Sequence, residues 1–265
     1  MKKHIKLFVN NNIQSKKCAK IAKEKLEDKG FKVVEDDDFE IAIAIGGDGS
    51  FIRMIKENNY REDLYYVGIN AGHLGFLQEV TIEDIDKFIK ELIKDEFKVE
   101  NIGIQETKVY VGDEVYKHHS LNEIVVRDEN LDLVQLNIYV NDDFLEDYVG
   151  DGLMICTSVG STAHNLSYGG SIVFPHFNTL QITSMAPIQS KRYSSIINSI
   201  IIPNKDVVKL VPKEKKNMMI TVDGQHIPYE NVDYVESTIG NKHIKCLRFS
   251  HYNFPQKIND KLLSK

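Results

Sequence analysis

An acid flanked by glycines, Gly46-Gly47-Asp48-Gly49-Ser50, follows an apolar run and precedes a helical pattern. Glycines let the backbone turn sharply and let a bulky anion approach the amides without interference from a Cβ atom. The helix start beyond adds unpaired N–H groups and partial positive charge. Asp48 would repel a phosphate in a plain cradle, but it suits phosphoryl transfer, where it takes a proton or binds Mg²⁺. Spacing alone leaves a purely structural turn equally open, and neither the P-loop nor the dinucleotide fingerprint is matched.

Four further segments place polar residues at predicted turns or strand ends. Residues 68–76 close another apolar run, where open α/β sheets bind ligands. Asn122 and Glu123 can present an amide and a carboxylate to a ribose or a base edge, although a solvent-facing pair is the commoner outcome. Residues 150–165 contain a second acid between two glycines and a Gly-Ser-Thr turn, which caps a helix or binds the polar edge of a ligand. Residues 222–226 fit a hairpin turn equally well.

The elements that must position these segments change in character near residue 98. Before it, apolar runs at 5–9, 31–34, 41–45 and 65–69 predict buried strands. Apolar residues at helical spacing predict three helices, at 19–26, from 50 onward and at 82–93. The third begins with a cap-like segment at 81–84. Continuous apolar strands joined by helices indicate a parallel sheet with both faces covered.

From about residue 99 to residue 249 the pattern is short alternating runs separated by turn residues, which predicts a β-rich second domain. The predicted strands are 107–111, 124–127, 134–140, 207–211, 218–222 and 244–249, and one helix is expected near 161–167. We therefore predict the fold class α/β plus β, with domains at 1–98 and 99–249. The tail at 250–265 is expected to pack back on the first domain.

Composition excludes several classes of protein. The net charge of −6 argues against a sequence-indifferent nucleic-acid binder, which needs a basic face. The 3 cysteines are widely spaced and form no CxxC pair, which favours a reducing cytoplasm over a disulfide framework or a zinc site. No run approaches the ~20 apolar residues of a membrane span, and the first apolar run is too short for a signal peptide. We expect a cytoplasmic protein with neither nucleic-acid nor membrane partners.

The segments taken together resemble the NAD kinase family. The resemblance is carried, in order, by GGDGS at 46–50, NAGHLGF at 70–76, NE at 122–123, GDGL at 150–153, GSTAHN at 160–165 and DGQ at 223–225. It implies Mg²⁺-dependent transfer of the γ-phosphate of ATP to the 2′-hydroxyl of the adenosine ribose of NAD, which gives NADP. It also implies a Rossmann-like N-terminal domain, a β-sandwich-like C-terminal domain, and a homodimer or homotetramer.

The resemblance also implies roles for individual residues. Asp48 is expected to accept the proton of the 2′-hydroxyl or to organise that step, and Gly46, Gly47, Gly49 and Ser50 are expected to hold the ATP phosphates. The residues expected to contact NAD are Asp48, Gly49, Arg53, Asn122, Glu123, Asp151, Thr162, Ala163, His164, Asn165, Leu166, Ser167, Ala186 and Gln225. The chemistry agrees, because a ribose hydroxyl is a poor nucleophile that needs a positioned carboxylate and a charge-neutralising metal. No metal ligands are assigned.

Three positions depart from the family pattern. His164 stands where tyrosine is usual, Ser158 and Val159 replace Pro-Thr, and Val149 stands where many members have a basic residue. These departures leave a non-catalytic dinucleotide sensor open. The GGDG loop alone also leaves a lipid kinase of the diacylglycerol type open, although no apolar or basic membrane-facing stretch is evident. The sequence does not separate ATP from polyphosphate as donor, or NAD from NADH as acceptor.

Overall fold

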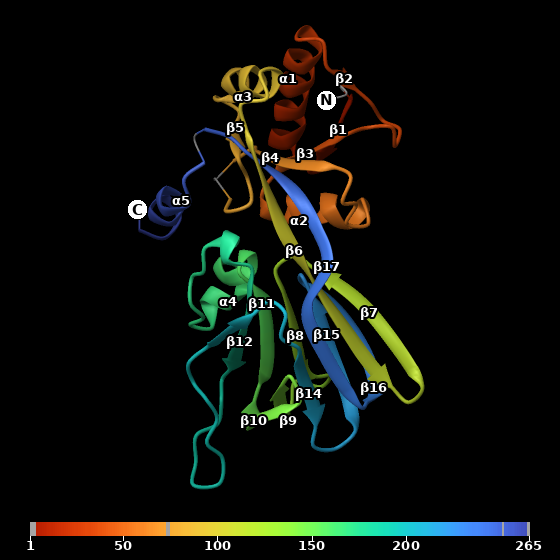
Figure 1. The fold of residues 1–265 in the computed structure, drawn as a ribbon, viewed down its shortest axis with the longest axis vertical. Helices are drawn as coiled ribbons and strands as arrows, with labels where there is room; N and C mark the ends of the chain where they lie inside the picture. Colours follow the sequence, from red (N-terminus) through yellow and green to blue (C-terminus); the bar gives the residue numbers. More distant parts are fainter. Residues whose placement is uncertain (1–3, 73–74, 251, 264–265) are drawn as a thin grey trace. The chain divides into compact units, whose positions relative to one another are not determined.

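The computed structural model describes residues 4–72, 75–250 and 252–263. Contacts divide the chain into two compact units, residues 1–102 together with 243–265, and residues 103–242 (Figure 1). The strands β6 (Lys98–Val111) and β17 (Tyr234–Arg248) carry the chain from one unit to the other. The chain is therefore of the mixed α/β class that the sequence predicts.

The first unit is built on a parallel sheet. Its elements are β1 (His4–Val9), α1 (Ile13–Asp28), β2 (Lys32–Val33), β3 (Ile41–Gly46), α2 (Asp48–Glu57), β4 (Tyr65–Asn70), β5 (Val80–Thr81), α3 (Ile85–Ile93), α5 (Phe254–Ile258) and a π-helical turn (Asn259–Leu263). The strands run in the order β4-β3-β1-β2, and both β5 and the end of β17 pair in parallel with β4. Strand β3 thus lies between β1 and β4.

Alternation along β3 explains how the helices cover this sheet. Ile41, Ile43 and Ile45 are fully buried in one cluster with side chains from α1 and α3. The alanines between them point to the opposite face, because successive side chains of a strand alternate. Figure 1 shows α1 and α3 on one side of the strands and α2 on the other. The central strand is consequently buried on both faces, and its end is rigidly placed.

Two helix starts differ from the expected positions. Helix α2 begins at Asp48, two residues before the predicted start at Ser50. Helix α3 begins at Ile85 and not near residue 82, because Val80 and Thr81 pair with β4 as a strand. The Thr81 hydroxyl donates to the Asp84 carboxylate, and that carboxylate does not cap the helix, so no capping box forms.

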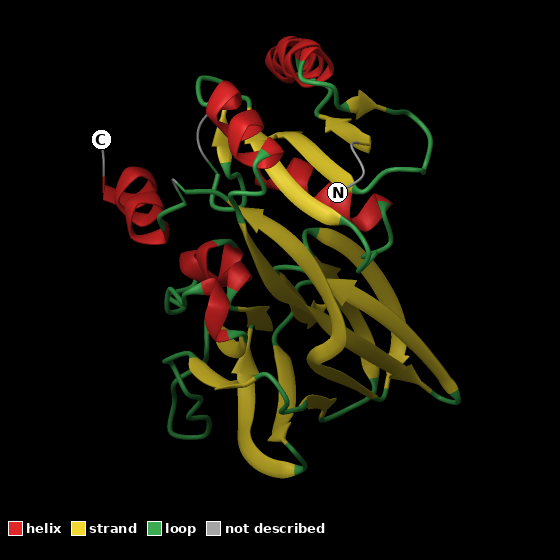
Figure 2. Ribbon diagram, turned by 45° about the horizontal axis from the view of Figure 1, so that its top comes forward, coloured by secondary structure: helices red, strands yellow, loops and turns green. Residues whose placement is uncertain are grey.

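The second unit consists mainly of antiparallel strands (Figure 2). Besides β6 and β17 it contains β7 (Glu114–Ser120), β8 (Glu123–Asp128), β9 (Val134–Val140), β10 (Asp143–Gly150), β11 (Gly152–Thr157), β12 (Thr179–Met185), β13 (Ile200–Pro203), β14 (Val208–Pro212), β15 (Lys216–Val222) and β16 (Gln225–Val232). Its short helices are η1 (Val159–Thr162), α4 (His164–Ser167) and η2 (Pro175–Phe177). One sheet has the order β13-β12-β11-β8-β15-β16, and the strands β10-β9-β14-β17 follow one another in the other sheet.

Side chains from both sheets form a single buried cluster in this unit. Ile124 and Ile220 come from the six-stranded sheet, and Leu136 and Leu210 come from the other sheet. The sequence pattern did not predict β10, β12 or β13, and it predicted only the last parts of β6 and β17. It also missed β7 and β16. The reason is that the side chains of β7 and β16 are mostly exposed, so their pairing with β6 and β15 leaves little apolar alternation to read. Among the described residues, no helix is long and apolar enough to cross a membrane.

Replacing Ile43 with alanine tests the central position of β3. The Ile43→Ala change leaves a cavity in a fully buried site, so we expect the free energy of unfolding in urea to fall by about 2–5 kcal/mol. Ile13→Ala is the matched control, because Ile13 is 76% exposed and its loss should change stability by less than about 0.5 kcal/mol. Equal effects of the two substitutions would contradict the assigned core.

Candidate functional site

Asp48 is the first residue of helix α2, and Gly47 caps that helix in an extended conformation. The Asp48 carboxylate bonds to a distant segment of the chain. It accepts the Phe76 N–H at 2.9 Å through Oδ2 and the Leu77 N–H at 3.0 Å through Oδ1. A carboxylate has about four lone-pair positions, so two remain for other donors. Asp48 is therefore a half-buried acid with a fixed orientation and spare accepting capacity.

The segment after β4 is shaped to reach this carboxylate. Asn70 closes a turn at the strand end, where its side chain accepts from the Gly72 N–H and donates to the Gly72 carbonyl. A Cβ atom on Gly75 would lie 1.9 Å from Asp48 Oδ1, so only glycine allows the approach. His73 and Leu74 of the NAGHLGF segment lie outside the described residues. The described part of this segment presents peptide N–H groups to the acid.

The four residues expected to hold the ATP phosphates have different surroundings. Gly47 and Gly49 are exposed, and a Cβ atom on either would meet nothing within 4 Å. Gly46 has a φ of +152°, and a Cβ atom there would lie 2.3 Å from the Ser50 hydroxyl oxygen. Ser50 is buried under Gly46, and its N–H donates to the Gly47 carbonyl. The helix start is therefore open to a ligand at Gly47 and Gly49, whereas Ser50 holds the turn together.

Arg53 lies exposed on helix α2, on the turn after Asp48. Its guanidinium donates to the Val9 carbonyl at 3.3 Å and pairs with Glu57 at 3.6 Å, one turn further along the helix. Exposed pairs of this kind contribute about 0.3–0.5 kcal/mol, so a phosphate can compete for the guanidinium at little cost.

In the second unit, Asn122 and Glu123 are gathered around the carboxylate of Asp223. This acid accepts the N–H groups of Leu121 at 2.9 Å, Asn122 at 2.8 Å and Glu123 at 3.3 Å. Asp223 occupies the two-residue turn between β15 and β16 with a φ of +45°, and Gly224 follows with a φ of +81°. The hairpin predicted at 222–226 is confirmed, and its acid binds the backbone of the Asn122–Glu123 segment.

The opposite side of the same segment is held by the turn after β11. The Asn122 carbonyl accepts the Thr157 N–H at 2.8 Å, and a Cβ atom on Gly160 would lie 2.1 Å from that carbonyl oxygen. Asn122 and Glu123 are 8% and 7% exposed, which corrects the expectation that a solvent-facing pair is commoner. The Asn122 side-chain oxygen is buried without a hydrogen-bond partner, so it is suited to accept a donor from a ligand.

Residues 162–167 lie on η1, at the junction after it, and on α4, and their side chains differ in burial. Asn165 is fully buried and is bonded to the Thr183 hydroxyl at 2.6 Å and to the Ser161 carbonyl at 3.3 Å. His164 and Ser167 are exposed, whereas Thr162, Ala163 and Leu166 are half-buried. The predicted NAD-contacting set thus divides into an internal anchor, Asn165, and side chains that reach the surface.

The His164 ring packs edge-on against Tyr168, with the ring centroids 5.2 Å apart. Desolvation and the nearby Arg127 charge lower the pKa of His164, so the ring is neutral near pH 7. Arg127 donates to the Tyr168 hydroxyl at 3.1 Å. The sequence reasoning missed Arg127 and Tyr168; the available signal was the position of Arg127 four residues after Glu123, which places both on the same face of β8.

The remaining predicted residues lie at strand ends. Asp151, Ala186 and Gln225 are all exposed, and Asp151 donates its N–H to the Met185 carbonyl at 3.0 Å, next to Ala186. Val149, where the family pattern expects a basic residue, is 2% exposed and belongs to the core. The Ser158 hydroxyl donates to the Pro175 carbonyl at 3.1 Å, so this departure from Pro-Thr ties the turn to η2.

A glycine-flanked acid at a helix start, beside a second strand-end loop, is suited to phosphoryl transfer at the ligand-binding edge of the sheet. Residues 1–97 match the family description "ATP-NAD kinase N-terminal domain", and residues 121–249 match "ATP-NAD kinase C-terminal domain". The chain is 40% identical over 269 residues to the NAD kinase of Finegoldia magna, covering 98% of each chain. It is 30% identical over 240 residues to the NAD kinase of Staphylococcus saprophyticus, covering 89% of each.

Two solved structures share the fold. Yeast NADH kinase complexed with NADH superimposes with a TM-score of 0.83 at 20% identity, over 98% of this chain and 87% of that one. An NAD kinase from Archaeoglobus fulgidus in complex with ATP gives a TM-score of 0.77 at 18% identity, over 99% and 98%. The chain belongs to the NAD kinase family and is a phosphotransferase of that kind. This decides against the lipid kinase and the non-catalytic sensor that the sequence left open.

Substituting Gly75 tests the close approach to Asp48. In Gly75→Ala the new methyl group collides with Asp48 Oδ1, so the two N–H bonds are lost and we expect a fall of about 1–3 kcal/mol in the free energy of unfolding in urea. Gly49→Ala is the control, because its Cβ atom meets open space and alanine favours the helix by up to about 1 kcal/mol. A Gly75→Ala protein as stable as the parent would contradict the geometry.

Replacing Asp223 with asparagine tests the anchor of the Asn122–Glu123 segment. The amide keeps one accepting oxygen and turns an NH₂ group toward an N–H donor, so we expect a loss of about 1–3 kcal/mol in urea unfolding. The exposed Asp142 offers the same chemical change without partners of this kind, and Asp142→Asn should stay within about 0.5 kcal/mol. Matching losses in both variants would show that Asp223 anchors nothing.

Proposed function

We propose that this chain transfers the γ-phosphate of ATP to the 2′-hydroxyl of the adenosine ribose of NAD, with Asp48 as the proton acceptor. The observation that carries the proposal is the Asp48 carboxylate, which two peptide N–H groups orient while two of its lone-pair positions stay available. A positioned carboxylate is the tool that a poorly acidic ribose hydroxyl needs. NADP formation thus follows from holding the hydroxyl between Asp48 and the incoming phosphate.

The phosphates of ATP are assigned to the open start of helix α2. Gly47 and Gly49 leave its first N–H groups accessible, and these groups together with the helix dipole attract anions. Arg53 lies on the same helix and, with Gly49, is proposed to contact NAD, for which it can exchange its weak partners for a phosphate oxygen of the dinucleotide. Gly46 and Ser50, which are also proposed to hold the ATP phosphates, lie against each other in the turn that leads into this helix.

The divalent metal expected from the sequence fits this donor set when it arrives with the nucleotide. Among the described residues, no three His, Cys, Asp or Glu side chains cluster as a metal cage. Mg²⁺ is commonly held by substrate phosphates and one or two carboxylates, and Asp48 is the acid of the glycine loop. When bound, Mg²⁺ would neutralise the charge that develops on the transferred phosphoryl group.

NAD recognition is assigned to the second unit as well. The buried, unpartnered side-chain oxygen of Asn122 suits a ribose hydroxyl as donor, and the buried carboxylate of Glu123 lies beside it in sequence. The other proposed NAD contacts are Asp151, Thr162, Ala163, His164, Asn165, Leu166, Ser167, Ala186 and Gln225. For Asn165 the proposal is narrower, because its side chain already bonds inside the unit and only its backbone is available.

The domain assignment remains part of this proposal. We assign residues 1–98, with the tail 250–265, to a Rossmann-like domain, which the parallel strands β1 to β4 and their helices support. We assign residues 99–249 to a β-sandwich-like domain, which the shared core between two antiparallel sets of strands supports, although residues 99–102 and 243–249 make their contacts within the first unit.

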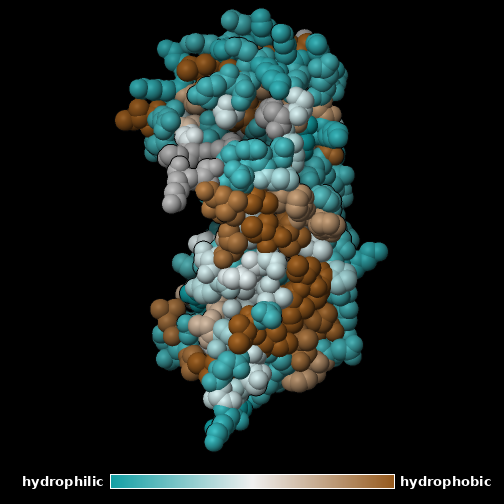
Figure 3. Space-filling view, turned by 90° about the vertical axis from the view of Figure 1, so that its left-hand side faces the viewer, coloured by the Kyte–Doolittle hydropathy of each residue, from teal (hydrophilic) through white to brown (hydrophobic). Residues whose placement is uncertain are grey.

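The setting of the enzyme is also proposed here. The three cysteines are buried thiols, which suits a reducing cytoplasm. Figure 3 shows hydrophobic side chains gathered on a face of the second unit, and in that unit Phe144, Phe177 and Ile197 are 60%, 63% and 66% exposed. Exposed apolar surface of this kind commonly marks a protein interface, which supports a homodimer or homotetramer.

The proposal is tested by replacing Asp48 with asparagine and measuring NADP formation from NAD, ATP and Mg²⁺. We expect Asp48→Asn to lower kcat by about 10²–10⁴-fold, because the side chain keeps its shape but accepts no proton. Asp28→Asn, at an exposed position of α1, is the control and should keep full activity. Circular dichroism verifies that both proteins are folded. Full turnover by the Asp48 variant would refute its role as proton acceptor.

A further inference from the structure

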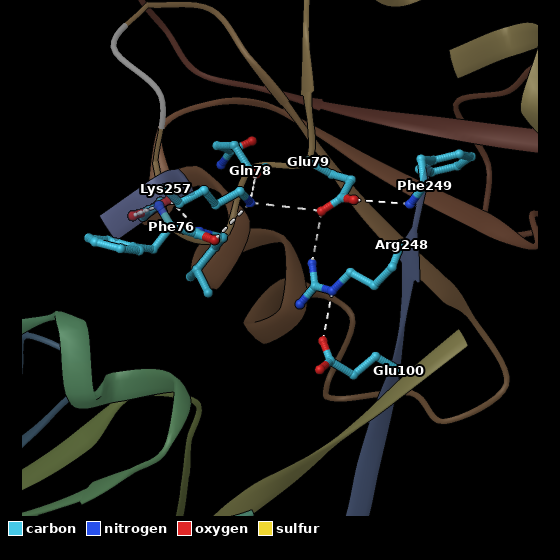
Figure 4. Close-up of polar contacts among 9 residues, drawn as sticks. Phe76, Gln78, Glu79, Glu100, Arg248, Phe249 and Lys257 are labelled. Atoms are coloured by element: carbon cyan, nitrogen blue, oxygen red, sulfur yellow. Dashed lines mark hydrogen bonds and ion pairs between the residues drawn. The ribbon is translucent and has the colours of Figure 1, made fainter. Parts of the chain in front are cut away.

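A buried lysine from the C-terminal tail lies beneath the loop that holds Asp48 (Figure 4). The Lys257 side chain is 7% exposed and extends from helix α5. Its Nζ donates to the Phe76 carbonyl at 3.2 Å and to the Gln78 carbonyl at 2.5 Å. Both carbonyls belong to the strand-end segment whose N–H groups bind Asp48. The charged Lys257 side chain therefore bonds to two backbone carbonyls of one short loop.

One of these bonds is connected to Asp48 through a single rigid group. The Phe76 carbonyl and the Leu77 N–H are the two ends of the same planar peptide unit. Lys257 donates to the carbonyl end, and the N–H end donates to Asp48 Oδ1 at 3.0 Å. Because the unit is planar, fixing its oxygen also fixes the direction of its N–H. A cation at the oxygen also polarises the amide and strengthens the bond it donates.

The second bond fixes the loop to the sheet. The Gln78 carbonyl binds Lys257, and the N–H at the other end of the same peptide unit, that of Glu79, donates to the Gly68 carbonyl of β4 at 2.8 Å. This peptide unit is therefore held at both ends, by the ammonium on one side and by the parallel sheet on the other. The loop has little freedom to move its N–H groups away from Asp48.

Buried carboxylates balance the charge of this ammonium (Figure 4). The Glu79 side chain is fully buried and lies 3.8 Å from Lys257 Nζ and 3.3 Å from an Arg248 nitrogen. Arg248 also donates to Glu100 at 2.7 Å, and the Phe249 N–H donates to Glu79 at 3.0 Å. When Lys257 is replaced, Glu79 retains Arg248 as a partner, but Arg248 then serves both Glu79 and Glu100, so we also expect some loss of stability.

We propose that Lys257 is a positioning residue for Asp48, which it serves by holding the peptide group between Phe76 and Leu77. The inference rests on the proposed function, because it concerns the alignment of the acid that takes the substrate proton. Lys257 touches neither Asp48 nor the reacting atoms by this account. It makes the C-terminal tail part of the active arrangement, although residue 257 follows Asp48 by more than 200 positions.

The charge state of Lys257 supplies a signature that a purely structural role lacks. Burial lowers the pKa of Lys257 to about 8, and the opposing attraction of Glu79 does not restore its usual value. The ammonium is therefore present below pH 8 and is lost above it. The other groups that face it are Arg248 from β17, Asp48 from α2, Glu100 from β6 and the ring of Tyr252 before α5. We expect kcat to decline as the pH rises through about 8.

The experiment compares Lys257→Met, Lys257→Arg and Lys20→Met by kcat, KM and pH profile. Loss of alignment in Lys257→Met should lower kcat by about tenfold to hundredfold with little change in KM. The arginine variant keeps a charge that titrates only above pH 12, so it should recover part of kcat and move the alkaline decline to higher pH. Lys20 is an exposed lysine of helix α1, and its loss should leave kcat unchanged.

A second measurement does not depend on turnover. Amide hydrogen exchange of Phe76 and Leu77 should become about tenfold faster in Lys257→Met and should stay unchanged in Lys20→Met. If the unmodified protein makes no NADP, the proposed function fails while the exchange result still judges the positioning role. Unchanged exchange, or reduced stability with unchanged kcat and pH profile in the folded Lys257→Met protein, would overturn the inference.

Discussion

The arrangement of the first unit depends on one interaction, the acceptance of two consecutive peptide N–H groups by the Asp48 carboxylate. It is possible because β3 and β4 are parallel neighbours, so the segments that follow them emerge at the same edge of the sheet. Gly75 removes the one Cβ atom that would occupy the position of the carboxylate oxygen. The acid is thereby oriented by backbone, whose direction is set by the sheet, and not by other flexible side chains.

The second unit also contains a carboxylate that accepts consecutive peptide N–H groups, but here the acid fixes the segment that donates to it. Asp223, in a tight hairpin, accepts three successive N–H groups and so fixes the Asn122–Glu123 segment. A glycine is again needed at the close approach, because a Cβ atom on Gly160 would collide with the Asn122 carbonyl oxygen. A carboxylate satisfies several N–H donors at once, and such charge-assisted bonds are stronger than neutral ones. Each acid therefore converts a loop into a fixed part of its unit, and in the first unit the acid itself is also left available for chemistry.

Buried charges behind the Asp48 loop have a cost that packing alone would avoid. Apolar residues of similar volume often replace a buried ion pair without loss of stability, so Glu79 and Arg248 are better explained by what they orient. Glu79 receives the Phe249 N–H and pairs with Arg248, while Lys257 reaches the loop carbonyls. The network ties the end of β17 and the tail helix to the strand-end loop, which makes distant parts of the sequence one structural element.

The sequence by itself determined the mixed α/β class, and its ordered motifs indicated the NAD kinase family. Continuous apolar runs marked the parallel strands, and a glycine-flanked acid marked the helix start, because both signals are local. Strands such as β7 were not predicted, because their exposed side chains show no apolar alternation. Strand β7 forms by pairing with β6. Only the tertiary structure decided that Asp48 is held by Phe76 and Leu77, and that Asp223 serves Asn122. These partners are separated by 28 to 101 residues, and no spacing rule connects atoms that only folding brings together.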